Sequence, residues 1–160
     1  MTIEFPPIGI VHSPFTVPEN MPIQPAGAAG VEGTVEVFEP YCPGLQDLDG
    51  FSHLILLYHF NRSSGFNLRV VPFLDTQPRG LFATRAPNRP NPIGLSIVQL
   101  AEINGCVLHL RNVDILDNTP LLDIKPYVPA FDAPQDVRVG WLEKTGGAVS
   151  SRKSDQRFTG

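Results

Sequence analysis

The sequence contains two cysteines, one tryptophan and no apolar run of about 18 residues, the length that a membrane helix requires. Its first residues lack a basic segment followed by an apolar one, so we expect neither a membrane span nor a secretory leader. Two cysteines are too few for a disulfide scaffold, and Cys42 and Cys106 do not have the CxxC spacing of zinc sites. We therefore interpret both as buried or incidental thiols. Together these absences predict a soluble, cytoplasmic protein.

Several motifs of enzyme chemistry are also missing. The four histidines show neither HxxxH nor HExxH spacing, so we expect no metal site. The chain has no GxSxG nucleophile elbow, no Walker loop and no GxGxxG after a strand. These absences argue against a nucleophilic triad and against a doubly wound nucleotide-binding fold.

Proline and glycine, in contrast, are abundant. The 160 residues include 17 prolines and 14 glycines spread along the chain, which excludes helical bundles and coiled coils. We predict a mainly β fold: a single small barrel with long proline-rich loops and one short C-terminal helix. The predicted strands are apolar segments of strand length: Ile8–His12, Gly33–Phe38, Ser52–Phe60, Leu68–Phe73, Gly80–Thr84, Leu95–Ile103, Val107–Val113 and Leu121–Ile124.

Local patterns predict one turn, one helix and a tail. Asn104-Gly105 separates two of these strands and predicts a two-residue hairpin turn with positive φ at both residues. Asp-Ala-Pro at residues 132–134 forms a helix start, which predicts a helix over 135–144. The last residues are polar and aperiodic, so we expect a barrel domain over 1–146 and a mobile tail over 147–160.

Charge is unevenly distributed along the chain, whose net charge is −4. Residues 1–61 contain seven acids and neither lysine nor arginine, whereas residues 62–89 contain five arginines and one acid. Arginine suits carboxylates and phosphates because its planar fork presents several donors. Residues 62–89 therefore either face an anionic ligand or form a solvated basic surface, and a pI near 5.5 argues against a strongly basic nucleic-acid domain.

Two segments concentrate polar side chains. Three prolines stiffen residues 80–96, GLFATRAPNRPNPIGLS, whose arginines and asparagines could be held ready for an anionic or purine ligand. The alternative is a rigid barrel-closing loop in which the arginines bind neighbouring carbonyls. Residues 114–127, DILDNTPLLDIKPY, contain a turn at 117–120, and Asp123 and Lys125 share a strand face. Either this segment is only a turn, or its carboxylates bind ribose hydroxyls or balance a cationic ligand.

These two segments, with IGIVHSPF and FSHLILLYHF upstream, closely resemble the TsaA-like family over about residues 5–130. Its best-understood members, of the TrmO type, are S-adenosylmethionine-dependent methyltransferases of threonylcarbamoyladenosine beside the tRNA anticodon. The resemblance implies a small mainly β barrel, S-adenosyl-L-methionine as cofactor, and methyl transfer to N6 of this nucleoside.

The resemblance also implies where the cofactor binds. Arg85 and Arg89 would meet the methionyl carboxylate by charge-assisted hydrogen bonds. Phe60 and Leu95 would pack on the adenine, and Asp117 would approach the ribose or the sulfonium. Positioning and electrostatics can drive an in-line methyl transfer without a metal, and no residue identifies itself as the catalytic base. The matching positions are Gln24, Pro25, Ala26, His59, Phe60, Arg85, Arg89, Leu95, Asp114, Ile115, Leu116 and Asp117.

Partners follow from the same resemblance, which implies a homodimer with the cofactor near its interface and tRNA as substrate. The longer tRNA-modifying relatives continue into a C-terminal domain, and basic residues often found after His12-Ser13-Pro14 are missing here. An alternative is therefore a module that binds S-adenosylmethionine, or methylates a small molecule or a protein. A third alternative is a purely structural β domain. If Arg69 and Arg79 line the cofactor rim, a polyanion can reach the methyl group.

Overall fold

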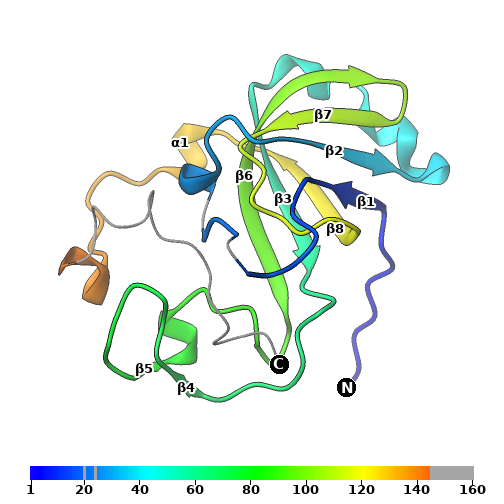
Figure 1. Cartoon of the computed structure of the whole chain (residues 1–160). Helices are drawn as coiled ribbons and strands as arrows, with labels where there is room; N and C mark the ends of the chain where they lie inside the picture. Colours follow the sequence, from blue (N-terminus) through cyan, green and yellow to red (C-terminus); the bar gives the residue numbers. More distant parts are fainter. Residues whose placement is uncertain (20, 24, 145–160) are drawn as a thin grey trace.

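The computed structural model describes residues 1–19, 21–23 and 25–144, and its main feature is a closed barrel of six antiparallel strands (Figure 1). The strands follow the order β1-β2-β7-β6-β3-β8, and β8 pairs with β1 to close the barrel. The predicted mainly β barrel is therefore confirmed. The bounds of its strands are β1 Gly9–His12, β2 Glu32–Val37, β3 His53–His59, β6 Ile93–Asn104, β7 Val107–Arg111 and β8 Thr119–Pro126.

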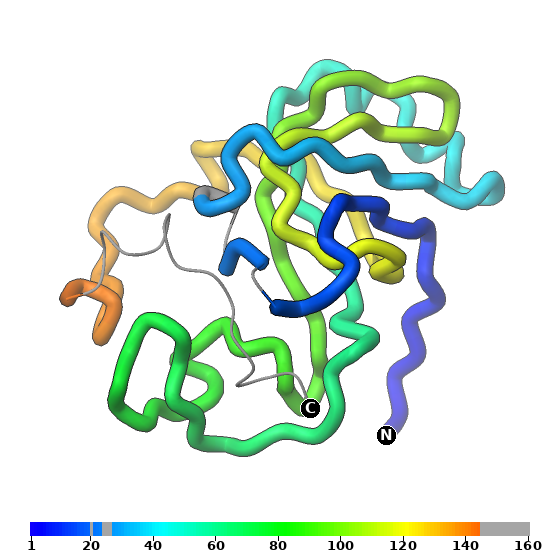
Figure 2. The backbone as a smooth tube through the Cα atoms, in the orientation of Figure 1, coloured from blue at the N-terminus to red at the C-terminus, as the bar shows by residue number. Residues whose placement is uncertain are grey.

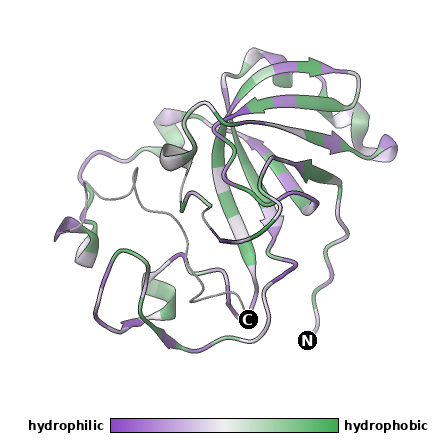
Figure 3. Ribbon diagram, viewed as in Figure 1, coloured by the Kyte–Doolittle hydropathy of each residue, from purple (hydrophilic) through white to green (hydrophobic). Residues whose placement is uncertain are grey.

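The barrel interior is filled by side chains at alternate strand positions. In β3, Leu54, Leu56 and Tyr58 are buried, while the residues between them are half-buried on the outer face. Burial alternates in the same way over much of β1, β6, β7 and β8, because successive side chains point to opposite faces of a sheet. Figure 3 shows apolar and polar residues mixed along the strands. Val11, Val35, Val98, Leu108, Leu110, Ile115 and Leu121 complete the centre of the core.

A short two-stranded arm, β4 Arg69–Val70 and β5 Arg79–Gly80, lies outside the barrel in the long connection between β3 and β6 (Figure 2). The predicted strands Leu68–Phe73 and Gly80–Thr84 are thus too long. Proline at position 72 follows β4 closely and offers no N–H to a ladder. After β5 the chain forms the 3-10 turn η4, Leu81–Ala83, in which Thr84 Oγ1 donates to the Leu81 carbonyl at 2.7 Å.

The hairpin between β6 and β7 differs from the prediction by one residue. Asn104 pairs with Val107, so Gly105 and Cys106 are the two turn residues. Gly105 has φ of 61°, and Cys106 has no positive φ, an arrangement typical of a type II′ turn. The predicted two-residue loop is present, but Asn104 belongs to the strand.

Cys106 forms a disulfide with Cys42, which lies in the 3-10 segment η2, Glu39–Leu45. The prediction of two free thiols is therefore wrong. The two cysteines are 64 residues apart in the sequence, and the barrel register alone brings them together. The bridge joins the β6–β7 turn to the segment that follows β2.

The predicted helix over 135–144 is absent. This part of the described chain instead has one α-helical turn, α1 Pro129–Asp132, and one 3-10 turn, η5 Gly140–Lys144, with the non-helical residues 133–139 between them. Gly140, where η5 begins, has φ of 57°. Asp132 Oδ2 accepts the Val128 N–H at 2.8 Å, so this side chain closes α1 rather than starting a later helix. Residues 129–140 are exposed, and a short helix without a buried face is not stable in water.

The remaining 3-10 turns are η1 Pro25–Ala28 and η3 Leu48–Gly50. Within the described ranges, every helix is too short to cross a membrane. The predicted tail over 147–160 lies outside the described residues.

Candidate functional site

A buried polar group occupies one end of the barrel interior, where β3 ends and β6 begins. Ser96 Oγ donates to Asp114 Oδ1 at 2.6 Å, and the Tyr58 hydroxyl lies 2.9 Å from the same Ser96 oxygen. All three residues are at most 9% exposed. We call Tyr58, Ser96 and Asp114 the Asp114 cluster. It is a chain of polar groups in an otherwise apolar core, which is expensive to build and is therefore a candidate for function.

The Asp114 cluster holds its carboxylate in an unfavourable environment. Burial raises the pKa of Asp114 from its ordinary value near 3.8 to about 6, while the Ser96 hydrogen bond and the charge of Arg85 favour the ionised form. Burial and the neighbouring Asp114 carboxylate also raise the pKa of Tyr58 well above its usual range. A buried carboxylate of this kind attracts a cation to the barrel end.

Arg85 supplies positive charge to this end of the barrel from the stiff loop between η4 and β6. Its guanidinium acts electrostatically on both Asp114 and Tyr58, and the residue is exposed. The exposed arginine and the buried carboxylate carry opposite charges and interact electrostatically. This arrangement suits a ligand that carries both a carboxylate and a cationic centre.

Arg89, in the same loop, has a different position. Its Nη1 atom donates to the carbonyls of Thr84 at 2.9 Å and Ala86 at 3.2 Å, and its guanidinium lies over the Phe82 ring. These contacts match the alternative in which loop arginines bind neighbouring carbonyls. Arg89 thus stabilises the loop that presents Arg85.

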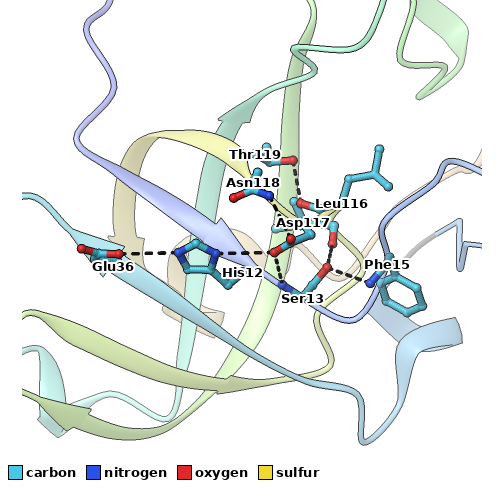
Figure 4. Close-up of polar contacts among 9 residues, drawn as sticks. His12, Ser13, Phe15, Glu36, Leu116, Asp117, Asn118 and Thr119 are labelled. Carbon is cyan, nitrogen blue, oxygen red and sulfur yellow. Dashed lines mark hydrogen bonds and ion pairs between the residues drawn. The ribbon is translucent and has the colours of Figure 1, made fainter.

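Asp117 lies in a second polar group at the end of β1 (Figure 4). Its Oδ1 accepts the Ser13 N–H at 3.1 Å and lies 3.5 Å from His12 Nδ1, while His12 Nε2 lies 3.6 Å from Glu36 Oε2. Asn118 has φ of 60°, so the predicted turn is also present. The Asp117 carboxylate therefore connects the β7–β8 loop to β1 and is partly exposed.

The strand residues of the predicted site lie on two faces. Phe60 packs edge-on against Tyr58, with ring centroids 5.4 Å apart, and its N–H donates to the Pro92 carbonyl at 2.8 Å. His59 pairs with Ile93 across β3 and β6, and Leu95 is 47% exposed on the outer face. Phe60 is thus next to the Asp114 cluster, whereas Leu95 faces outward.

The remaining predicted positions are distributed as follows. Ile115 is buried in the core, and its carbonyl accepts the Ser13 hydroxyl; the Leu116 carbonyl accepts Thr119 Oγ1 at 2.7 Å. Pro25 and Ala26 belong to η1, which lies against β6. Gln24 lies outside the described residues.

Two recesses in the described part of the chain are lined by none of the predicted site residues. The larger, about 640 Å³, lies on the outer wall of the barrel beside His12, Glu102 and His109. The smaller, about 380 Å³, lies between the arm and the loop that carries Asn88. In a single copy of the chain the predicted cofactor positions include exposed residues, Arg85 and Leu95, as well as buried ones, Asp114 and Ile115.

Sequence reasoning missed Tyr58 and Ser96. The available signal was a serine at an inward-facing position of an apolar strand, one residue after Leu95. Of the two arginines considered as rim markers, Arg79 is engaged, since its Nε binds Asp75 Oδ2 at 2.6 Å and its guanidinium lies over Trp141, and Arg69 lines the smaller recess. Asp123 and Lys125, predicted to share a strand face, bind each other at 2.8 Å.

Comparisons with known proteins agree with this fold. Residues 10–133 match the family model of the tRNA-methyltransferase O N-terminal domain. A probable S-adenosyl-L-methionine-binding protein of Pyrococcus abyssi is 53% identical over 99% of this chain and 86% of its own length. The tRNA (adenine(37)-N6)-methyltransferase of Escherichia coli is 32% identical over 92% of this chain and 67% of its own length.

Comparison with solved structures also shows similarity to TrmO proteins. The crystal structure of TrmO from Pseudomonas aeruginosa superposes with a TM-score of 0.75 at 40% identity. The match covers 88% of this chain but only 63% of that chain, so the likeness extends over part of the solved protein. The resemblance inferred from residues 5–130 is confirmed, and the chain belongs to the family of the tRNA-methyltransferase O N-terminal domain.

Proposed function

We propose that this chain binds S-adenosylmethionine at the barrel end formed by the Asp114 cluster and Arg85, and transfers its methyl group to N6 of adenosine 37 in tRNA, in its threonylcarbamoyl form. The observation that carries this proposal is the buried Asp114 carboxylate beside the exposed Arg85. The names of the Escherichia coli relative and of relatives that bind S-adenosylmethionine support it.

The charge pattern of the barrel end fits the cofactor. Arg85 would receive the methionyl carboxylate, since a charged hydrogen bond to a guanidinium is strong. The carboxylates of Asp114 and Asp117 would lower the potential around the sulfonium or approach the ribose. Phe60 and Leu95 would pack on the adenine, and Arg89 would hold the loop in shape. The other contributing positions would be Gln24, Pro25, Ala26, His59, Ile115 and Leu116.

When bound, S-adenosylmethionine would supply an electrophilic methyl group to N6; the C–S bond electrons would stay on sulfur as S-adenosylhomocysteine, and the N6 proton would pass to solvent. The chain contributes the orientation of the reacting groups and the electrostatic field around them. Arg85 and Asp114 orient the charged groups of the cofactor, and the buried network of Ser96 and Tyr58 keeps the carboxylate from turning away. Burial in the core keeps water away from that carboxylate, which strengthens its electrostatic effect.

We include a homodimer in this proposal because large apolar side chains near the proposed cofactor positions are open to solvent. Ile93, Leu95 and Phe82 are 41%, 47% and 74% exposed, which is unusual for large apolar side chains near a site. A second copy packed on this face would cover them and close the cofactor site. The proposal also includes a cytoplasmic location, a barrel domain over 1–146 and a separate tail over 147–160.

A second candidate function is binding of S-adenosylmethionine without methyl transfer to tRNA, or with transfer to a small molecule or a protein. The relative from Pyrococcus abyssi, at 53% identity, carries a name that mentions only binding of this cofactor. The match with the solved TrmO chain from Pseudomonas aeruginosa covers 63% of that chain, so activity of the whole solved protein is not carried by the likeness alone.

Calorimetric titration with S-adenosylmethionine, with S-adenosylhomocysteine and ATP as comparators, tests the cofactor. We expect binding of both sulfur ligands and none of ATP. Transfer of labelled methyl to tRNA, with and without its threonylcarbamoyl group, then tests the acceptor. Binding without transfer to either tRNA would select the second candidate, and absence of binding would reject both.

A further inference from the structure

We propose that the recess between the β4–β5 arm and the loop before β6 holds an unpaired base of the substrate RNA, next to the nucleotide that is methylated. This inference rests on the proposed function and adds a second contact for its substrate. The recess has a volume of about 380 Å³ and is lined by Phe66, Asn67, Arg69, Val71 and Asn88, among others. We call it the Asn88 recess.

Asn88 provides the first argument. Its Oδ1 atom is shielded from solvent and has no hydrogen-bond partner within the described ranges. An unsatisfied buried acceptor costs about 1–3 kcal/mol, so a donor that enters the recess is favoured. The χ2 torsion of asparagine is soft, which lets the amide turn toward a ligand. Asparagine amides recognise bases that carry an exocyclic amine, adenine above all.

Phe66 and Val71 provide the second argument. They line the recess and are 49% and 37% exposed, so two apolar surfaces face solvent beside polar groups. Single-stranded RNA loops expose unstacked bases, which proteins bind by stacking on aromatic rings and by hydrogen bonds to base edges. A flat heterocycle with a polar edge matches this combination of phenyl ring and amide.

Arg69 provides the third argument, since a base in RNA always brings a phosphate. The residue is exposed, and its side chain makes no ion pair within 4 Å to the described acidic residues. No acidic residue lines the Asn88 recess, whereas Glu32 and Glu102 line the larger recess on the outer wall. Of the two recesses, only the smaller has a charge that suits RNA.

The covalent structure places the Asn88 recess near the methyl-transfer end of the barrel. Asn88 follows Arg85 by three residues, so their Cα atoms are at most about 11 Å apart even in an extended chain. Prolines at positions 87 and 90 restrict this segment further. A base in the recess and the acceptor nucleotide would therefore be close enough to belong to the same RNA loop, and the recess contact would help to fix the register of that loop.

The test uses the full chain and a fluorescein-labelled RNA hairpin whose loop contains adenines. Phe66→Ala, Arg69→Gln and Asn88→Ala should each weaken binding of this hairpin, by about 5- to 150-fold for Phe66→Ala from the loss of stacking. Phe5→Ala and Arg111→Gln are matched controls at exposed positions outside the recess, and they should leave the affinity unchanged. Affinity for S-adenosylmethionine and the dimer mass should be unchanged in all five variants.

A second probe tests the amide. A hairpin with purine, which lacks the exocyclic amine, in place of adenine should lose affinity for the natural chain but not for Asn88→Ala. The recess proposal alone fails if the natural chain binds RNA and S-adenosylmethionine while the recess variants bind RNA equally well. It also fails if these variants lose their dimer, since the recess would then contact a second copy. If the natural chain binds S-adenosylmethionine but no RNA, the proposed tRNA function fails together with it.

Discussion

Ser96 Oγ donates a hydrogen bond of 2.6 Å to Asp114 Oδ1, which joins the start of β6 to the loop after β7. The donor comes from a strand position that faces the core, so it cannot exchange this partner for water. The carboxylate is consequently fixed in direction while it is deprived of solvation. Such a carboxylate strengthens the local electrostatic field but lowers the free energy of unfolding, a combination that is typical of functional sites.

The first prediction concerns stability and pH. The folded-state pKa of Asp114, about 6, exceeds the unfolded value near 3.8, so the native chain binds more protons than the unfolded chain between these values. The free energy of unfolding should therefore decrease as pH rises from about 4 to 6, by up to about 3 kcal/mol. Urea melts at several pH values should show this dependence.

Asp114→Asn should remove this pH dependence of the free energy of unfolding. Asparagine cannot ionise, but it can still accept a hydrogen bond from the Ser96 hydroxyl. At neutral pH this variant should be more stable than the natural chain and should bind S-adenosylmethionine more weakly. Asp123→Asn, on an exposed carboxylate, is the matched control and should preserve the pH dependence. An unchanged pH dependence in Asp114→Asn would contradict the assignment.

The second prediction concerns cofactor affinity. Arg85→Ala should weaken binding of S-adenosylmethionine by roughly 1.5 to 3 kcal/mol, the contribution of a hydrogen bond to a charged group. Arg111→Ala removes an arginine from the outer wall, where it faces Glu32, and should have no effect on the affinity. Calorimetry measures both. Equal affinities in a folded Arg85→Ala variant would remove Arg85 from the site.

The third prediction concerns Gly94, which lies opposite Tyr58 in the β3–β6 pairing. A Cβ atom at Gly94 would lie 2.2 Å from Tyr58 Cε2, so the ring would have to move and break its contact with Ser96. Gly94→Ala should therefore lower the free energy of unfolding by about 1–3 kcal/mol and weaken cofactor binding.

Gly44→Ala is the control for this substitution, because nothing lies within 4 Å of the added Cβ there. It should leave both quantities close to those of the natural chain. Thermal melts and calorimetry of the two variants give the comparison, and equal stability of both would show that the Tyr58 ring can move without loss.

The fourth prediction concerns the disulfide. Cys42 and Cys106 close a loop across 64 residues, so reduction should lower the free energy of unfolding by roughly 2 to 4 kcal/mol. A double variant with serine at both positions should be destabilised by a similar amount and should no longer respond to reductant. Urea melts with and without dithiothreitol measure this, and a natural chain that is insensitive to reductant would contradict it.

Sequence patterns predicted the barrel well because its strands alternate visibly or carry long apolar runs. β1, β2, β3, β6 and β7 begin and end within about two residues of the predicted segments. The predicted arm strands are too long: the Leu68 carbonyl still accepts the Leu81 N–H at 2.9 Å, but the described ladder pairs only Arg69–Val70 with Arg79–Gly80, and Pro72 has no N–H to extend it. Strand propensity describes the conformation that a residue favours, whereas a β-ladder also requires a neighbouring strand with which to form hydrogen bonds.

The features that sequence patterns missed depend on distant contacts. The Cys42–Cys106 bridge requires η2 to lie beside the β6–β7 turn, which no local spacing reveals. The Ser96–Asp114 bond likewise depends on which face of β6 points inward. For the predicted helix over 135–144, the N-terminal signal was present, but the segment lacks a surface on which an apolar face could be buried.

The pairing of β1 with β8 has a consequence for synthesis. The first strand obtains its second neighbour only when residues 119–121 are available, more than 100 residues later. Arg85 and Asp114 come together only in the closed barrel, so a growing chain cannot acquire the proposed cofactor site step by step. Ordering must occur late and in one cooperative event, since non-local pairing delays folding until the distant segment arrives. A ribosome-bound chain that stops before β8 should therefore be unable to bind the cofactor, however much of the sheet it already contains.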